Sequence, residues 1–267
     1  MTAIAVTIAG SDSGGGAGVQ ADLKTFSALG VYGASVLTAL TAQNTLGVTG
    51  IHDVPTAFIR AQIDAVYSDL DVGATKIGML SQPGVIRTVA AGLDAHEVGP
   101  IVLDPVMVAA SGDPLLADEA IDVLIAELLP RADLVTPNLH EAARMLRRNP
   151  AENEAEMVDQ AQNLRAMGAR VVLLKGGHGA GSECADVLVS DADIVWLRAP
   201  RLETLNTHGT GCTLSSAIAA GLAKGAHLDA AVGDAKTYIT AAIEAADDLG
   251  IGHGHGPVHH FYNLWRG

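Results

Sequence analysis

The residues best suited to chemistry form a short turn, Gly209-Thr210-Gly211-Cys212, just before a predicted helix of small residues from about position 212 to 223. The N–H groups at a helix N-terminus carry partial positive charge and point toward a ligand. Glycine lets the backbone approach a phosphoryl group without a Cβ in the way. Such a turn stabilises the charge on a transferring phosphoryl group, so we predict a phosphate-transfer centre in residues 206–212.

Cys212 stands where this helix begins, a position that tends to lower the pKa of a thiol. It could therefore accept the proton of a substrate hydroxyl. The alternative is a small buried apolar side chain that fills a gap, and the sequence leaves both interpretations open. Cys184 has no comparable context and is expected to be structural. The two cysteines form no C-x-x-C pair, so no zinc or redox motif is indicated.

A glycine-rich loop, residues 10–18, links a predicted strand to a predicted helix. It fits the dinucleotide fingerprint G-x-G-x-x-A, which also requires an acidic residue ~20 positions further on. No Asp or Glu occurs between Asp22 and Asp53, so this interpretation is disfavoured. The loop is either a flexible turn or a close approach to a small substrate, with Asp22 pointing into the site. No lysine follows a glycine anywhere in the chain, which excludes a Walker A motif.

Candidate partners for a phosphate follow other predicted strands. Asp104 ends one apolar run, Asn138 and Glu141 open a helix after another, and Lys175 stands between a third run and a pair of glycines. Carboxylate and amide oxygens suit magnesium, and the lysine suits a phosphate. Asn138 and Glu141 also fit a local helix cap with its acidic partner, which explains them equally well.

Four histidines crowd the C-terminal tail, at positions 253, 255, 259 and 260. Histidine-rich tracts can bind metal, but this spacing matches no defined site. The neighbouring glycines indicate a loop, and no functional metal is expected there.

These residues must be positioned by alternating strands and helices. Strand–helix alternation predicts an α/β fold whose mostly parallel sheet is covered on both faces, with ligands at the carboxyl ends of the strands. No linker or break in composition divides residues 1–267, so one domain is predicted. The predicted strands are 4–9, 31–40, 74–79, 101–105, 134–135, 171–174 and a hairpin of 187–189 with 194–197; the predicted helices are 18–29, 55–70, 85–93, 115–129, 139–146, 154–167, 212–223 and 228–249.

Composition limits the partners. Hydrophobic residues make up 49% of the chain and charged residues 17%, which suits a large core. A formal net charge of -14 repels phosphate backbones, so no nucleic-acid partner is expected. The chain has neither a signal-like N-terminus nor an apolar run of the ~18 residues that a membrane span needs. We expect a cytoplasmic protein without membrane contact.

Several motifs occur in an order that resembles the hydroxymethylpyrimidine/phosphomethylpyrimidine kinases of thiamine biosynthesis, within the ribokinase-like superfamily. The resemblance covers essentially the whole chain. Several of the motifs are weak alone, but their order is highly specific. They are IAGSDSGGGAGVQADLK (8–24), ALTAQNT (39–45), KIGML (76–80), LDPVM (103–107), TPNLHEA (136–142), LKGGH (174–178), NTHGTGCTLS (206–215) and GHGPVHHF (254–261).

The resemblance implies two successive phosphorylations by ATP with Mg²⁺. The first converts 4-amino-5-hydroxymethyl-2-methylpyrimidine to its monophosphate, and the second converts the monophosphate to the diphosphate. It also implies a three-layer α/β/α sandwich and a homodimer.

The resemblance also assigns roles to residues of this chain. Gln43 and Asp22 would hydrogen-bond the aminopyrimidine, and Gly10, Met79 and Val106 would line its pocket. Cys212 takes the place of the aspartate base of sugar kinases. The remaining assignments are Asp104, Asn138 and Glu141 around the metal and phosphates, Lys175 on the ATP phosphates, and Thr207, His208 and Lys236 as further nucleotide neighbours.

Two other functions remain open from the sequence. Pyridoxal kinase uses the same scaffold, and a dual-specificity enzyme is an intermediate case. The amide of Gln43 favours the pyrimidine, because it can accept from an amino group and donate to a ring nitrogen. A catalytically silent pyrimidine-binding module is the alternative from another class, and the joint presence of Asp104, Lys175 and Cys212 disfavours it.

Overall fold

A twisted eight-stranded sheet forms the centre of the molecule in the computed structural model, which describes residues 1–108, 115–116, 118–177 and 182–265. The strand order is β10-β9-β8-β7-β6-β5-β1-β2. Six strands are parallel, and β9 and β10 form an antiparallel hairpin at one edge. The strands are β1 (Ile4–Ala9), β2 (Tyr32–Leu37), β5 (Ala74–Ile77), β6 (Ile101–Leu103), β7 (Leu134–Val135), β8 (Val172–Leu174), β9 (Glu183–Val189) and β10 (Ile194–Pro200).

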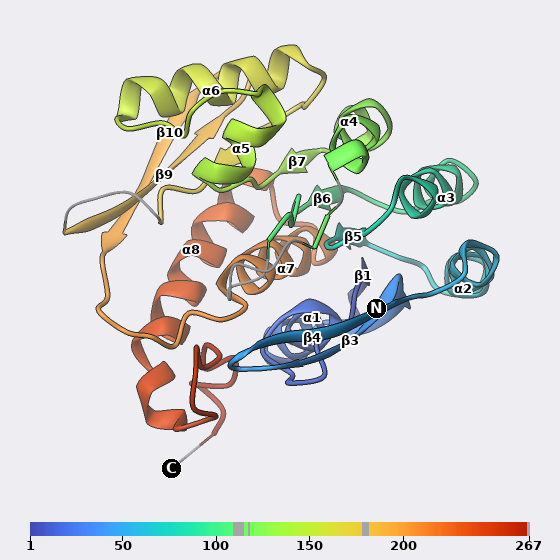
Figure 1. Cartoon of the computed structure of the whole chain (residues 1–267), viewed down its shortest axis with the longest axis horizontal. Coiled ribbons are helices and arrows are strands. Elements are labelled where there is room, and N and C mark those ends of the chain that lie inside the picture. Colours follow the sequence, from blue (N-terminus) through green and yellow to red (C-terminus); the bar gives the residue numbers. More distant parts are fainter. Residues whose placement is uncertain (109–114, 117, 178–181, 266–267) are drawn as a thin grey trace.

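Helices cover both faces of this sheet, which confirms the predicted three-layer sandwich (Figure 1). One face carries α2 (Thr56–Tyr67), α3 (Pro83–Leu93), α4 (Asp118–Glu127), α5 (Leu139–Leu146) and α6 (Glu154–Ala166). The other carries α1 (Gly18–Ala28), α7 (Thr210–Ala223) and α8 (Leu228–Glu244). Short 3-10 helices occupy Leu129–Arg131 and Ala246–Leu249. No helix in the described part of the chain is long and apolar enough to span a bilayer.

Apolar residues on both faces of each central strand produce two cores. In β6, Ile101 and Leu103 join the core beneath α2–α6, whereas Val102 joins the core beneath α1, α7 and α8. Successive side chains of a strand point to opposite faces, so a strand buried on both sides must be apolar throughout. The short apolar runs in the sequence therefore locate these strands correctly.

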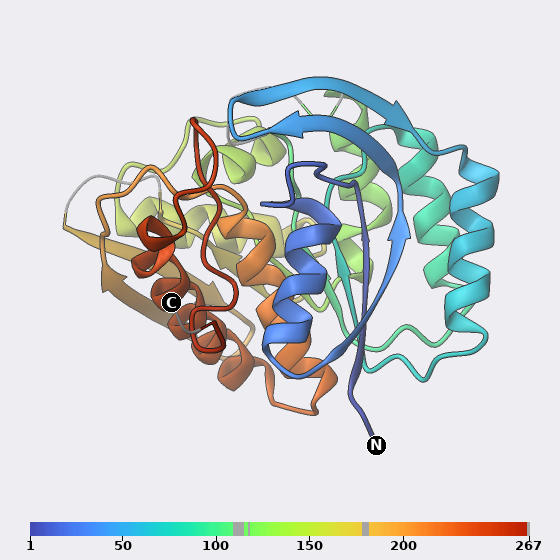
Figure 2. The same ribbon diagram turned by 90° about the horizontal axis from the view of Figure 1, so that it is seen from below.

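The extended run predicted at 31–40 is divided in the structure. β2 ends at Leu37, and a separate antiparallel hairpin follows, made of β3 (Ala39–Asn44) and β4 (Gly47–Asp53). The hairpin arches beside the glycine-rich loop (Figure 2). The Ser11 N–H donates to Ala39 O at 2.8 Å, and the Gln43 N–H donates to the Ser13 hydroxyl at 2.8 Å.

Two predicted helices end in 3-10 turns in the structure. The helix predicted at 115–129 is α4 followed by a 3-10 turn; Leu115 and Leu116 precede it, and Ala117 lies outside the described residues. The helix predicted at 228–249 ends at Glu244 and continues as the 3-10 turn Ala246–Leu249.

The C-terminal tail connects the hairpin to the body of the protein. The His255 N–H donates to Thr45 O at 2.9 Å, at the hairpin tip, and the His208 N–H donates to Gly256 O at 3.0 Å. Further along, His260 is buried, and its Nε2 lies 3.1 Å from the Thr213 hydroxyl. Burial, assisted by nearby cationic groups, lowers the pKa of His260 to about 3, so this imidazole is neutral in the folded protein.

We predict that His260 makes the protein less stable in mild acid. The unfolded chain takes up a proton below about pH 6.5, whereas folded His260 stays neutral until about pH 3. Stability is therefore lost as pH falls through this window, by about 1.4 kcal/mol per pH unit from this group. Urea unfolding at pH 7.5 and pH 5 should show a smaller loss for His260→Gln than for the wild type.

The matched control is His253→Gln, because the His253 side chain is exposed. This variant should retain the wild-type dependence of stability on pH. An unchanged dependence in His260→Gln would contradict the prediction.

Candidate active site

A pocket with a volume of about 830 Å³ lies at the carboxyl ends of the parallel strands. Its walls come from the glycine-rich loop, the hairpin, the loops after β5, β6 and β8, and the start of α7. The predicted site residues found in its lining are Gly10, Gln43, Met79, Asp104, Val106, Asn138, Glu141, Lys175, Thr207, His208, Gly209, Thr210, Gly211, Cys212 and Lys236. Asp22 is the predicted site residue that is not in the lining. His178, quoted in one motif, lies outside the described residues.

The start of α7 fits closely against the glycine-rich loop. Gly209 caps the helix with φ +79°, and a Cβ at this position would lie 1.9 Å from Gly16 O. A Cβ at Gly16 would in turn lie 2.4 Å from a ring carbon of His208. Only glycine is compatible with both positions, because these distances are far below van der Waals contact.

The first turn of α7 presents N–H groups to the pocket. The Thr210 N–H donates to Thr207 O at 3.2 Å, and the Thr213 N–H donates to Gly209 O at 2.9 Å. The N–H groups of a first turn have no acceptor inside the helix. Within the described residues, this leaves the N–H groups of Gly211 and Cys212 for a ligand, while the anion hole expected at Gly209, Thr210, Gly211 and Cys212 stays a prediction.

Asp104 and Lys175 form a buried ion pair at the pocket floor. Lys175 Nζ lies 3.0 Å from Asp104 Oδ1, and the Thr136 hydroxyl donates to the same oxygen at 3.2 Å. Burial opposes ionisation of Asp104, but the charges of Lys175 and Lys76 outweigh it and hold the pKa of Asp104 below its usual value. A negative and a positive charge are thus both available beside the α7 turn.

Asn138 and Glu141 form the predicted capping box of α5. The Asn138 N–H donates to Glu141 Oε2 at 2.7 Å, and the Glu141 N–H donates to Asn138 Oδ1 at 2.9 Å. Both residues also line the pocket, so the local explanation and a functional one are compatible. Burial, partly offset by Lys175 and increased by the charge of Asp104, raises the pKa of Glu141 to about 7.

A divalent cation would relieve the repulsion between Asp104 and Glu141. No group of three or more His, Cys, Asp or Glu side chains in a metal-binding arrangement occurs among the described residues. Magnesium commonly uses one or two carboxylates together with substrate phosphates and waters. The two carboxylates fit that kind of site, in which the nucleotide supplies the other ligands.

Asp12 organises the glycine-rich loop and was not predicted as a site residue. Its carboxylate accepts the N–H groups of Gly14 and Ala17, each at 2.8 Å. The same carboxylate lies 2.8 Å from His208 Nε2, and Gln43 Nε2 lies 3.5 Å from that nitrogen. His208, predicted as a nucleotide neighbour, therefore lies beside the residue predicted to bind the pyrimidine. The pairing joins positions 196 residues apart, which no local pattern indicates.

Lys236 lies with Cys184 in another part of the pocket wall. Its Nζ lies 2.7 Å from Asp186 Oδ2 and 3.6 Å from Cys184 Sγ. Cys184, expected to be structural, also lines the pocket.

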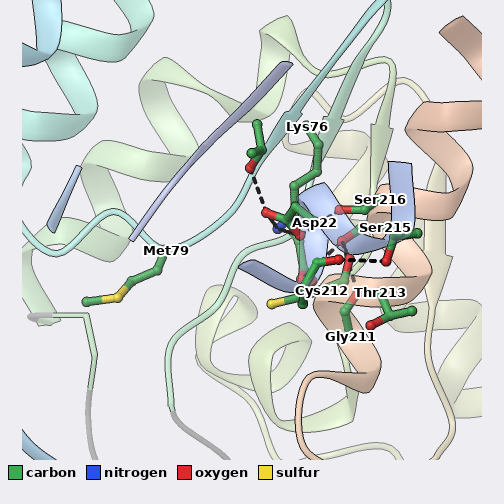
Figure 3. Close-up of polar contacts among 12 residues, drawn as sticks. Asp22, Lys76, Met79, Gly211, Cys212, Thr213, Ser215 and Ser216 are labelled. Carbon is green, nitrogen blue, oxygen red and sulfur yellow. Dashed lines mark hydrogen bonds and ion pairs between the residues drawn. The ribbon is translucent and has the colours of Figure 1, made fainter. Parts of the chain in front are cut away.

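Asp22 is not in the pocket lining, and it lies beside Lys76 and Ser216 (Figure 3). Lys76 Nζ lies 2.9 and 2.8 Å from its two oxygens, and the hydroxyls of Thr7 and Ser216 each donate to it at 2.6 Å. The expected contact between Asp22 and a substrate stays a prediction, but both oxygens already have partners. Lys76, a pocket residue that was not predicted, had one signal in the sequence: a charged residue within a buried apolar strand.

The predicted lowering of the Cys212 pKa is wrong. Burial raises the pKa of this thiol to about 11, although Lys76 and a hydrogen bond from the Gly18 backbone lower it. The negative charges of Asp22 and Asp104 act in the same direction as burial. The side chain is partly exposed at the pocket wall, yet protein atoms surround it closely enough to disfavour the thiolate.

Comparison with known proteins identifies the family. The sequence model described as phosphomethylpyrimidine kinase matches residues 12–259. The chain belongs to this family. The kinase is 60% identical over 266 residues to the hydroxymethylpyrimidine/phosphomethylpyrimidine kinase of Rhizobium meliloti (strain 1021), with 100% of each chain covered.

Solved structures confirm the ribokinase-like fold of the kinase. A Bacillus subtilis pyridoxal kinase in complex with ADP superposes with a TM-score of 0.91 at 35% identity, covering 99% of this chain and 100% of that chain. A phosphomethylpyrimidine kinase from Clostridium difficile 630 gives a TM-score of 0.80 at 43% identity, covering 90% of this chain and 99% of that chain. The family predicted from the motifs is thereby confirmed.

We predict that Cys212 of the kinase reacts slowly with iodoacetamide at pH 7. The thiolate is the nucleophile, so its reaction rate should rise about tenfold per pH unit and reach no plateau below about pH 10. The measurement is intact mass against time in a Cys184→Ser background, with Cys184→Ser/Cys212→Ser as the unlabelled control. A plateau near pH 8 would instead show that the helix start lowers the pKa.

Proposed function

We propose that this chain, acting as one kinase domain of residues 1–267, transfers phosphate from ATP to 4-amino-5-hydroxymethyl-2-methylpyrimidine and then to the monophosphate. The observation that carries the proposal is the joint pocket: Gln43 on one wall, and the free N–H groups of the α7 turn beside Lys175 on another. The kinase of Rhizobium meliloti, at 60% identity over full length, supports the same substrates.

The pyrimidine binds between the hairpin and the loops after β5 and β6. The Gln43 amide can accept from the pyrimidine amino group and donate to a ring nitrogen. Met79 and Val106 supply apolar contact, and Gly10, which has no Cβ, lets the ring approach the backbone. A Cβ at Gly10 would also crowd the pocket residue Met79, at 3.0 Å from its Sδ.

The phosphoryl group binds at the start of α7. The Gly211 and Cys212 N–H groups and the Lys175 ammonium stabilise its charge, and such preorganised donors are the main catalytic need in phosphoryl transfer. Cys212, in its thiolate form, accepts the proton of the substrate hydroxyl. Thr207 and Lys236 lie further along the lining and contact the nucleotide.

Asp104 and Glu141 would hold Mg²⁺ together with the nucleotide phosphates and water, while Asn138 orients Glu141. When bound, Mg²⁺ would supply neutralisation of the charge on the phosphates. Glu141→Gln keeps a side chain able to cap α5 but removes a charge, so the Mg²⁺ concentration needed for half-maximal activity should rise. An unchanged requirement would exclude Glu141 as a ligand.

The decisive experiment is product analysis with ATP, Mg²⁺ and the hydroxymethyl alcohol. We expect the monophosphate to appear first and the diphosphate to follow. Binding of the pyrimidine with no ADP formed would favour the silent module instead.

Pyridoxal is the second candidate substrate, because the pyridoxal kinase of Bacillus subtilis shares the fold at a TM-score of 0.91. We predict much faster ADP formation with the hydroxymethylpyrimidine than with pyridoxal in a coupled assay. Comparable or reversed rates would contradict the role assigned to Gln43.

For the chemical step, we predict that Cys212→Ala lowers kcat by about 10²- to 10⁴-fold, the usual contribution of a general base. The KM for ATP should change little, because the backbone N–H groups remain. Near-wild-type kcat would leave only the N–H groups and Lys175 as catalytic elements.

The functional unit is proposed to be a homodimer in the cytoplasm, where ATP is available. Exposed apolar side chains occur on β2, β3, β4 and α2, at Tyr32, Leu40, Ile51 and Phe58. A second copy would cover such a surface. Light scattering should give the mass of two chains, and a single-chain mass at micromolar concentration would contradict the dimer.

A further inference from the structure

A lysine is fully buried in strand β5, directly beneath the α7 turn. Lys76 and Asp22 both have 0% exposed side chains, and the ammonium lies 2.8 Å from the nearer carboxylate oxygen. The hydroxyls of Thr7 and Ser216 donate to the same carboxylate at 2.6 Å each. Figure 3 shows this cluster next to Cys212.

This ion pair is not needed to fill the core. Replacing a buried ion pair by apolar groups of similar volume is often neutral or stabilising, because two charges must otherwise be desolvated. The two members of the pair differ in their place: Lys76 belongs to the pocket lining, whereas Asp22 does not. A Cβ at Gly78 would lie 2.8 Å from Lys76 Nζ, so the chain also leaves room for the ammonium at this point.

The sulfur of Cys212 lies beside two helix N-termini. Cys212 belongs to the first turn of α7, and the backbone of Gly18, the first residue of α1, lowers the pKa of its thiol. The starts of the two helices are in close contact, because a Cβ at Gly209 would lie 1.9 Å from Gly16 O, and each N-terminus carries partial positive charge. Lys76 adds a full charge that neither rotates away nor exchanges with solvent.

The charged groups around the thiol come from several elements. Lys76 on β5 favours the thiolate, and so does Lys175 after β8; Asp22 on α1 and Asp104 after β6 oppose it. Among these charges, Lys76 has the largest effect on the thiol, and the effect of Asp22 is smaller. Removing Lys76 should therefore disfavour the thiolate even if Asp22 is neutralised at the same time.

We propose that Lys76 is a positioning residue for phosphoryl transfer, whose ammonium, held from behind by Asp22, is the fixed counter-charge for the Cys212 thiolate. The inference rests on the proposed function. In the step that it assists, the thiolate form of Cys212, a small fraction of the molecules at neutral pH, takes the proton of the substrate hydroxyl while the hydroxyl oxygen bonds to the γ-phosphorus. The bond from that phosphorus to the bridging oxygen breaks, ADP keeps the electron pair, and the thiol later returns its proton to solvent.

The test is Lys76→Met in a Cys184→Ser background. We expect the alkylation profile of Cys212 to move to higher pH, so that labelling at pH 8 becomes about tenfold slower for every pH unit by which the profile moves. The kcat should fall at least tenfold, with little change in the KM for ATP. An alkylation profile identical to that of the background would overturn the proposal.

Ser216→Ala is the matched control. It removes a neutral partner of the same carboxylate, a hydroxyl at 2.6 Å, and leaves the lysine in place. Its stability should fall, but its alkylation profile should stay where it is in the background. An equal displacement of the profile in Ser216→Ala and Lys76→Met would mean that the cluster acts only through packing, and would also overturn the proposal.

Lys76→Met leaves Asp22 unpaired in the core, so the variant could fail to fold. The double variant Lys76→Met/Asp22→Asn replaces the ion pair by a neutral pair of similar volume. We expect it to fold and to show an alkylation profile that moves to higher pH, by less than in the single variant. If the folded double variant had the same alkylation profile as the Cys184→Ser background, Lys76 would not be the counter-charge of Cys212, and the proposal would be overturned.

Alkylation does not depend on turnover, so the two proposals can fail separately. If the profile moves as expected but Cys212→Ala keeps full kcat, the base role of the proposed function fails and the electrostatic link survives. If no kinase substrate is found, the alkylation profile still decides whether Lys76 controls the thiol.

Discussion

Two buried ion pairs beneath the first turn of α7 hold the site together. Asp22 pairs with Lys76, and Asp104 pairs with Lys175. Neighbouring serines of α7 donate to one aspartate each, so the helix is attached to both pairs. Breaking a buried pair by removing one partner typically costs about 3–5 kcal/mol. The position of the α7 N–H groups therefore depends on all four charges remaining balanced.

The same balance of charges and burial explains why the pKa of Cys212 is raised, whereas its position at a helix start alone would suggest a lowered pKa. A helix N-terminus contributes typically about 0.3–1 kcal/mol to a nearby charge, whereas full burial can change a pKa by up to about 3–5 pH units. Burial is the larger effect here, and two aspartates add to it. A thiol in this setting depends on neighbouring positive charge before it can serve as a base, which is why Lys76 matters to the chemistry.

The pocket is enclosed in part by the β3–β4 hairpin, which hydrogen bonds fasten to the rest of the protein. The β3–β4 hairpin contacts the glycine-rich loop through Ser11 and Ser13, and the C-terminal tail fastens its tip through Thr45. The tail also fixes the backbone of His208, because the His208 N–H donates to Gly256 O. The same tail therefore supports both the pyrimidine side of the pocket and the α7 turn. A movement of the hairpin would thus change the position of Gln43 and His208 together.

The sequence by itself determined the architecture, the family and the local caps. Short apolar runs predict doubly buried strands, motif order indicates the kinase family, and the Asn138–Glu141 capping box lies within one turn of helix. All of these depend on residues close together in the chain or on their order. The hairpin was missed because the side chains of β4 are largely exposed, so that strand lacks the apolar run that marks a buried one.

Only the tertiary structure decided which charges meet. The partner of Asp22 is 54 residues away, and the partner of Asp12 is 196 residues away. It also decided the protonation of Cys212 and His260, because a pKa depends on desolvation and on charges brought in by distant segments. Periodicity and propensity carry no information about such pairings. The chain therefore specifies the phosphate-binding turn locally, while the state of its cysteine is a property of the folded core.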